Sequence, residues 1–419
     1  MSIEPVVREP VETPGGYRWV VLAVGTLGVF AALGLARFGY STVLEPMQQE
    51  LRFGNTAAGA LASANLTGYL LLAVIGGALA SRFGTRLVAV AGLAVVGVSM
   101  LLTSTAGSFA AICCWRAVTG VGSGAANVAI MGMWPAWFPA RLRGRAAGVA
   151  VAGSSLAMML TGVTVPGILQ AAPAGGWRTC WLLFGLAALA VTALTWIFLR
   201  NRPAGAAPFA AAAPRWGSVY RSPAVWHLGA IYTAFGFSYI IYLTFFVKYL
   251  VAERDYSKPD ALWLFFLMGA CSVFCGVIWG AVSDYFGRRT ALTLVFLVHA
   301  AAFALFALSP TPGGLLASAV LFGFSAWSVP AIMAAACGDV LGARLSAAGL
   351  GFITLFFGIG QAAAPSVAGA LADSTGSFGI AFLLAAVIAL AGAGGSLLLP
   401  KGLSPTERES RHHPDQRMY

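Results

Sequence analysis

Apolar residues fill almost the whole chain in stretches of about twenty, separated by short segments rich in Gly, Pro and charged residues. A helix of about 20 residues covers roughly 30 Å, the thickness of the hydrocarbon core of a bilayer. The pattern therefore predicts twelve transmembrane helices. They fall near residues 18–41, 57–80, 86–105, 109–133, 144–169, 178–199, 224–249, 261–283, 290–309, 313–337, 346–370 and 378–399.

The composition supports a membrane protein. Hydrophobic residues make up 59% of the chain and charged residues 9%, with a mean hydropathy of +0.83. A soluble domain carries roughly a quarter charged residues. The sequence holds no metal-ligand cluster, no nucleophile with a base and no phosphate-binding loop after a strand, so neither an enzyme nor a bound cofactor or metal is expected. We expect the lipid bilayer as the surroundings.

The basic residues are distributed unevenly across the predicted membrane. With the N-terminus in the cytoplasm, eighteen of the 25 Lys and Arg residues fall on the cytoplasmic side. Such a bias fixes orientation, and it predicts that both termini are cytoplasmic. The net charge of +11 thus reports topology and does not indicate a nucleic-acid partner. Five basic residues fall outside: Arg52, Arg178, Lys248, Arg254 and Lys258.

The spans divide six and six. Residues 200–222 (RNRPAGAAPFAAAAPRWGSVYRS) are basic and rich in Pro and small residues, which predicts a cytoplasmic linker. It separates a six-helix bundle at 17–199 from a second at 223–399. Short cytoplasmic segments are expected at 1–16 and 400–419.

The two halves carry a repeated motif. GALASRFGTR (77–86) follows the second span, and GAVSDYFGRR (280–289) follows the eighth, 203 residues later. Internal repeats of this kind are typical of secondary transporters, whose binding site lies near the bilayer midplane between the halves.

These features resemble the major facilitator superfamily (MFS). The resemblance rests on the twelve spans, the linker, the repeated G-x-x-x-[DS]-x-x-G-x-R loop, the R-x-x-x-G-x-G motif that starts at Arg116, and residues 360–376. It covers about residues 17–400. It implies an all-α membrane protein with two pseudo-symmetric six-helix bundles, which alternates access by a rocker-switch movement. A monomer in the cytoplasmic (inner) membrane of a bacterium is implied, with organic-anion carriers among the similar members.

The resemblance also implies gating residues. In the family, the aspartate and arginines of the two loop motifs hold the halves closed on the cytoplasmic side. Ser81 replaces the aspartate in the first half, so an asymmetric gate is expected. The gating residues are then Arg82, Arg86, Asp284, Arg288 and Arg289.

Arg37 and Arg116 lie inside long apolar runs, and no carboxylate accompanies them at that depth. A charge near the bilayer centre costs about 3 kcal/mol on insertion scales, and such residues usually face a bundle interior or a watery path. Two buried cations without an anion predict an anionic cargo. Two alternatives stay open: Arg37 could reach the headgroups, and Arg116 could be hydrogen-bonded to helix carbonyls.

Other polar residues could line the same path. Tyr239 and Tyr242 belong to an aromatic stripe on the seventh span, which could equally be packing core. The amides and Tyr69 could instead form hydrogen bonds between helices. The remaining substrate-binding candidates are Asn127, Asn65, Tyr69 and Gln361.

The sequence thus predicts a secondary active transporter for a small organic anion, a carboxylate. An efflux pump for drugs or other amphipathic molecules is the alternative. It is disfavoured because none of the 14 Asp and Glu residues lies at mid-span. Whether protons are coupled through the anion, Glu45 or His299 stays open, and a sensor that transports nothing would carry a large added domain.

Overall fold

The computed structural model describes residues 16–172, 174–203, 219–341 and 345–399. The expected N-terminal segment, most of the linker and the tail lie outside these residues. Within them, the regular structure is entirely helical.

The first half (residues 16–203) follows the predicted spans. Its first span is continuous from Tyr17 to Leu51, but its middle turns are wound as a π-helix. The elements are α1 (Tyr17–Val29), the π-helix η1 (Phe30–Phe38), α2 (Gly39–Leu51), α3 (Asn55–Phe83), α4 (Thr85–Thr105), α5 (Phe109–Met131), the short α6 (Trp134–Trp137), α7 (Ala140–Ala171) and α8 (Gly176–Phe198).

The second half (residues 219–399) contains two interrupted spans, the eighth (α11 and α12) and the tenth (α14 and α15). Eleven helical segments of the described residues are long and apolar enough to cross a bilayer, and the divided eighth span completes the predicted twelve. The elements are α10 (Pro223–Glu253), α11 (Lys258–Ser272), α12 (Cys275–Phe286), α13 (Arg288–Leu308), α14 (Pro312–Gly323), α15 (Ser328–Leu341), α16 (Ser346–Thr375) and α17 (Gly379–Leu397).

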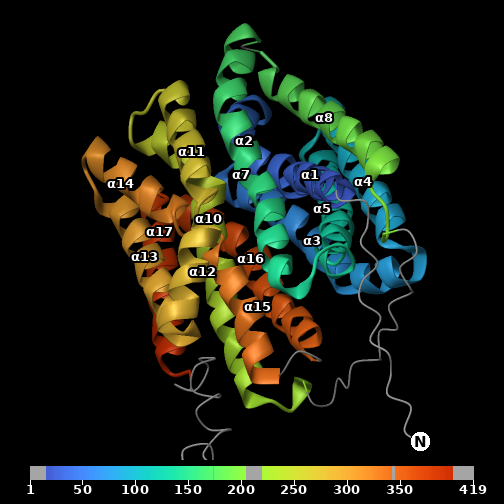
Figure 1. Cartoon of the computed structure of the whole chain (residues 1–419). Helices are drawn as coiled ribbons and strands as arrows, with labels where there is room; N and C mark the ends of the chain where they lie inside the picture. The colour runs from blue at the N-terminus through green and yellow to red at the C-terminus, as the bar shows by residue number, and fades with distance from the viewer. Residues whose placement is uncertain (1–15, 173, 204–218, 342–344, 400–419) are drawn as a thin grey trace, which may run out of the picture.

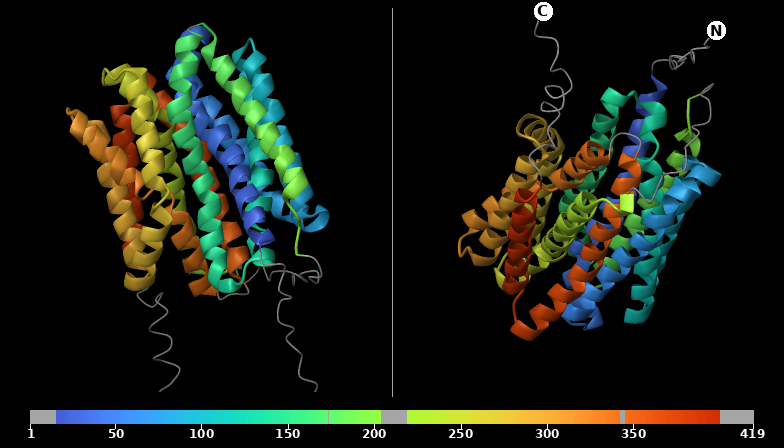
Figure 2. Two further views of the ribbon diagram at one scale, coloured as in Figure 1. Left: turned by 45° about the horizontal axis from the view of Figure 1, so that its top comes forward. Right: turned by 90° about the horizontal axis from the view of Figure 1, so that it is seen from below.

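The long helices run side by side along one axis (Figure 2). In Figure 1, α13, α14 and α17 lie on the left and α4, α5 and α8 on the right, with α10 and α16 near the centre. The halves meet mainly where α3 packs on α16 and α7 packs on α11. We name the two ends of the bundle by their loops. The Arg52 end is where α2, α10 and α16 terminate, and the Gly84 end is where α3 and α12 terminate.

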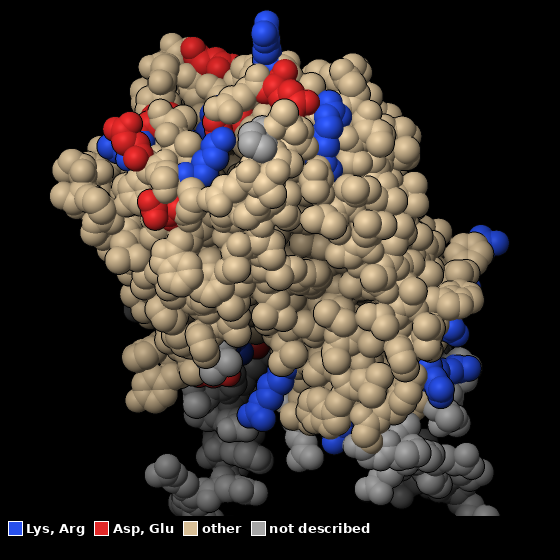
Figure 3. Space-filling model, turned by 90° about the horizontal axis from the view of Figure 1, so that it is seen from above, with Lys and Arg blue, Asp and Glu red and all other residues tan. Residues whose placement is uncertain are grey.

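Charged side chains avoid the middle of the bundle surface. Figure 3 shows Lys, Arg, Asp and Glu gathered toward opposite ends of the face in view, with a broad uncharged surface between them. Large apolar side chains such as Leu71, Ile197 and Val387 are more than half exposed. An apolar belt between two polar rims is what a bilayer requires of the helices it surrounds.

The repeated loop motif has the same geometry in both halves. Gly84 and Gly287 each end one helix and begin the next, with φ of +88° and +83°. Only glycine adopts this backbone region without strain.

The motif arginines also occupy equivalent places. Arg86 Nε donates to the carbonyl of Trp196 at 3.1 Å, and Arg289 Nη1 donates to the carbonyl of Leu399 at 3.2 Å. Donor and acceptor in the first pair each lie 203 residues before their counterparts in the second. The offset seen in the sequence therefore recurs in the contacts.

The remaining gating candidates bond within their own halves in this conformation. Arg288 pairs with Asp284 at 2.6 Å and with Asp339 at 3.1 Å. The Arg82 guanidinium lies 5.3 Å from the ring centroid of Phe83. Among the residues described, none of these contacts crosses to the other half, so their gating role stays a prediction.

Several polar bonds join the halves at the Arg52 end. The carboxylate of Asp373 on α16 accepts from the backbone N–H of Asn55 (3.0 Å) and of Thr56 (2.7 Å), and from the Thr56 hydroxyl (2.6 Å). It thereby caps the N-terminus of α3, which has no side-chain cap of its own. Lys258 on α11 pairs with Glu45 on α2 at 2.8 Å. These bonds hold the halves together at this end.

Candidate functional site

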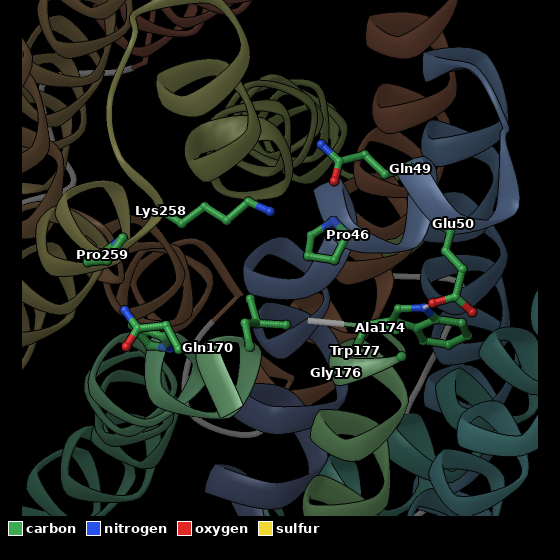
Figure 4. Close-up of a pocket in the computed structure, with 12 residues that line it drawn as sticks. Pro46, Gln49, Glu50, Gln170, Ala174, Gly176, Trp177, Lys258 and Pro259 are labelled. Carbon is green, nitrogen blue, oxygen red and sulfur yellow. Dashed lines mark hydrogen bonds between the residues drawn. The ribbon is translucent and has the colours of Figure 1, made fainter. Parts of the chain in front are cut away.

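A pocket of about 780 Å³ opens at the Arg52 end (Figure 4). It lies among α2, α7, the start of α8 and α11, and the Lys258 side chain extends into it. None of the predicted substrate-binding residues lines this pocket. The cluster that unites most of them lies at mid-span instead.

Arg37 is the centre of this cluster. It lies in η1, and its Nη1 donates to the Tyr239 hydroxyl and to Gln361 Oε1, both at 3.2 Å. Tyr239 also donates to Gln361 Oε1, at 2.9 Å. Because Tyr239 lies on α10 and Gln361 on α16, Arg37 points across the interface into the second half. It does not extend toward headgroups.

The first half adds two more predicted residues. The guanidinium carbon of Arg37 lies 4.6 Å from the ring centroid of Tyr69 on α3, in a cation–π contact. Asn127 on α5 donates through Nδ2 to the Tyr69 hydroxyl at 2.9 Å. We call Arg37, Tyr69, Asn127, Tyr239 and Gln361 the Arg37 cluster.

Several polar atoms of the Arg37 cluster are buried and lack a hydrogen-bond partner in the described structure. They are Nε and Nη2 of Arg37, Nε2 of Gln361 and Oδ1 of Asn127. Among the described residues, no carboxylate forms an ion pair with Arg37. A buried unsatisfied group costs about 1–3 kcal/mol, and more if it is charged. Three unpaired nitrogen donors, two of them on the Arg37 guanidinium, form an arrangement that suits an anion.

Aromatic rings border the cluster on the second-half side. Tyr239 stacks on Phe235 with centroids 4.7 Å apart and on Phe357 at 5.9 Å, and it meets the edge of Trp327 at 6.4 Å. Phe38, the neighbour of Arg37, lies 5.4 Å from Trp327. The cluster thus combines a cation and polar groups with flat apolar walls, which suits an amphipathic guest. Sequence reasoning missed Trp327 and Phe357, because neither belongs to a polar pattern.

Arg116 lies elsewhere. It is 1% exposed, its Nη1 donates to the Ala36 carbonyl at 2.6 Å, and its guanidinium lies between the rings of Tyr40 (4.9 Å) and Trp181 (5.1 Å). The structure agrees with the alternative in which Arg116 is hydrogen-bonded to a helix carbonyl. Asn65 also stays apart from the cluster, because its Nδ2 donates to the Arg116 carbonyl at 3.1 Å.

Tyr242 faces the interior of the second half. Its hydroxyl is 2.6 Å from Ser318 Oγ, and its ring contacts Phe303, Phe306 and Phe322. Of the eight predicted substrate-binding residues, the structure brings five into the Arg37 cluster. It leaves Arg116, Asn65 and Tyr242 outside.

Close helix packing explains how α5 delivers Asn127 to this place. A Cβ on Gly120 would lie 1.9 Å from the Asn65 carbonyl oxygen, and one on Gly124 would lie 2.4 Å from that of Tyr69. Only glycine lets the backbones of α3 and α5 approach so closely. Gly120, the first glycine of the R-x-x-x-G-x-G motif, is therefore a packing residue that, with Gly124, sets the spacing of Tyr69 and Asn127.

Two repeated halves of membrane-spanning helices, with a polar cluster between them, define a multi-pass membrane transporter. The sequence profile described as "Uncharacterised MFS-type transporter YbfB" matches residues 29–396, and the chain belongs to this family of the major facilitator superfamily. The all-α fold and the transporter class expected from the sequence are confirmed. The family consists of transporters rather than enzymes.

Two curated relatives align over most of their length. The chain is 26% identical to a probable sulfoacetate transporter, SauU, of Cupriavidus necator, over 94% of this chain and 98% of the relative. It is also 26% identical to a hexuronate transporter of Bacillus subtilis, over 85% and 88%. A crystal structure of a bacterial homologue of the human lysosomal transporter Spinster superposes with a TM-score of 0.75 at 15% identity, over 92% of this chain and 97% of that one. This last likeness concerns the fold alone.

Proposed function

We propose that the protein is a secondary active transporter that carries a small organic anion, a carboxylate, through the Arg37 cluster. The observation that carries the proposal is the Arg37 guanidinium. It lies at mid-span between the halves with two buried, unpaired nitrogens and no carboxylate partner among the described residues. A carboxylate can accept two parallel hydrogen bonds from such a group. The free Nε2 of Gln361 offers a further donor.

The position of the cluster supports alternating access. Its residues come from both halves, so a movement of one half against the other separates Arg37 from Tyr239 and Gln361. A bound anion contacts both halves only while they are close, which links occupancy to the movement. Polar bonds join the halves at the Arg52 end, and the distribution of basic residues predicts that this end faces the outside of the cell. We therefore interpret the conformation as closed toward the outside of the cell, in the membrane of a bacterium.

The relatives' substrates agree with an anion. Sulfoacetate and hexuronate both carry negative charge at neutral pH, and each relative is similar over most of its length. A pump for cationic drugs would need a buried carboxylate in the path. The carboxylates of Glu45 and Asp373, in contrast, are already engaged in contacts between the halves. This favours the anion carrier over the drug-efflux alternative.

The proposal can be tested by counterflow in proteoliposomes. Purified protein is loaded with one unlabelled compound and exposed to the same labelled compound, for glucuronate, sulfoacetate, 4-hydroxybenzoate and, as a cationic control, tetraphenylphosphonium. We expect exchange of at least one anion and none of the cation. Exchange of the cation alone would contradict the anion carrier and support the efflux of cationic compounds.

Two variants of Arg37 sharpen the test. Removing one partner of a buried charged pair costs about 2–5 kcal/mol, so Arg37→Ala should weaken the apparent affinity at least about 30-fold. Arg37→Lys keeps the charge but presents a single donor point instead of a planar fork, and we expect an intermediate loss. Unchanged exchange in Arg37→Ala, with normal amounts of folded protein, would remove Arg37 from the site.

A further inference from the structure

The first span contains a π-helix where Arg37 lies. η1 covers Phe30–Phe38, and at its end the Gly39 N–H bonds to the Gly34 carbonyl, five residues back. Helices on either side of it have ordinary α spacing. The carbonyls of Leu35 and Ala36 follow at the point where five-residue spacing returns to four-residue spacing. Segments of π-helix are frequent at functional sites.

Arg116 supplies a donor at this place. Its Nη1 donates to the carbonyl of Ala36, the residue immediately before Arg37, at 2.6 Å. Tyr40 from α2 and Trp181 from α8 cover the guanidinium on two sides, and the residue is 1% exposed. This guanidinium is therefore occupied by the first half itself, in contrast to that of Arg37.

The opposite side of η1 is fixed by packing. A Cβ on Gly34 would lie 2.2 Å from the Cβ of Ala157 on α7, so the two helices touch there. With α7 against Gly34 and Arg116 bound at Ala36, the π-helix is held from both sides. The fixed backbone sets the direction in which the side chain of the next residue, Arg37, leaves the helix.

We propose that Arg116 is a positioning residue: it holds the π-helical turn so that the Arg37 guanidinium crosses to Tyr239 and Gln361. The proposal rests on the anion-binding role of Arg37 and assigns Arg116 no contact with the guest. Arg116 then acts on transport only through Arg37.

A labelling experiment tests the positioning without any substrate. Arg37→Cys is introduced into full-length protein, alone and together with Arg116→Met, and reaction of the new thiol with a small cationic methanethiosulfonate is followed by peptide mass spectrometry. Because Arg116→Met removes the donor to Ala36, we expect the labelling rate at position 37 to change at least fivefold. The rate at the native Cys114, which is exposed on α5, should stay within twofold. An unchanged rate at position 37 would overturn the proposal.

A double-mutant cycle tests the functional link. The apparent affinity is measured by counterflow, with whichever of glucuronate, sulfoacetate and 4-hydroxybenzoate the wild type exchanges. We expect Arg116→Met to lower it at least tenfold in the wild type but less than twofold in the Arg37→Lys background, because neighbours that act as one unit are not additive. Arg116→Lys, which keeps a charged donor, should restore most of the affinity.

Equal losses in both backgrounds would show that Arg116 acts independently of Arg37 and would overturn the proposal. If Arg116→Met does not elute as a monodisperse protein, Arg116→Gln takes its place in both experiments. If the wild type exchanges none of the anions, the proposed function fails, whereas the labelling result still decides the positioning role.

Discussion

Gln361→Glu places a carboxylate where the Arg37 cluster now has a neutral amide. The Oε1 atom of Gln361 is 3.2 Å from Arg37 Nη1 and 2.9 Å from the Tyr239 hydroxyl. A carboxylate in this position pairs with Arg37 from within the protein. Two unit charges about 4 Å apart attract by roughly 4 kcal/mol at an effective dielectric constant of about 20. A guest anion would have to displace this internal partner or share the cation with it.

An energy of this size corresponds to a loss of affinity of about a thousandfold, since each 1.4 kcal/mol is about tenfold. The matched control is Gln361→Met, which removes the amide without adding charge. It removes the donor that Gln361 Nε2 offers to the anion, a hydrogen bond to a charged group worth about 1.5–3 kcal/mol, or roughly ten- to a hundredfold in affinity. Affinity is measured by thermal shift and counterflow with the exchanged anion.

The melting temperature of the unliganded protein tests the pairing with Arg37 independently of anion binding. Gln361→Glu gives the buried Arg37 a partner that it lacks, so its melting temperature should equal or exceed that of the wild type. We expect affinity to fall while stability holds. If the two variants lose affinity equally, or if Gln361→Glu binds the anion as well as the wild type, Arg37 is not the anion-binding group.

Three further substitutions probe other contacts. Tyr239→Phe should lower anion affinity about fivefold in counterflow, because it removes hydrogen bonds worth roughly 1 kcal/mol. Tyr242→Phe, the matched control, should leave affinity unchanged. If Tyr242→Phe had the larger effect, the site would lie elsewhere on α10. Asp373→Ala removes the cap on α3, which costs about 0.5–2 kcal/mol. Spin-label distances across the Arg52 end should then show a larger open population, and an unchanged distribution would exclude the cap as a latch. Gly120→Leu should prevent folding, measured as loss of the monodisperse elution peak, whereas Gly144→Leu, with open space around it, should not.

The fold could be predicted well because the length of each apolar stretch identifies a membrane-spanning helix. Each predicted span corresponds to a helical segment, and the 203-residue repeat recurs in the Arg86 and Arg289 contacts. The interruptions could not be predicted. The break at Val273 and Phe274 and the π-helix of Phe30–Phe38 both lie in long apolar stretches, in which Arg37 is the one charged residue. Hydrophobicity does not distinguish four-residue from five-residue hydrogen bonding.

The site was predicted less completely for a geometric reason. Tyr239 and Tyr242 lie three residues apart, about 60° around the helix. This angle is enough for one to meet Arg37 and the other to enter the interior of the second half. The sequence alone does not reveal which neighbour each face meets. Arg116 illustrates the same limit, because a long side chain can reach several helices and only the fold shows that it ends at Ala36.

Both arginines hold a buried positive charge, and different groups stabilise the two charges. Arg116 binds a carbonyl and two ring faces, all supplied by the first half, so its surroundings are the same wherever the second half moves. Arg37 binds neutral acceptors that the second half supplies, and two of its nitrogens stay unpaired. Its partners are lost when the halves separate, unless an anion replaces them. A cation whose solvation depends on the movement is the one that can couple a guest to that movement, and for this reason we assign the anion to Arg37.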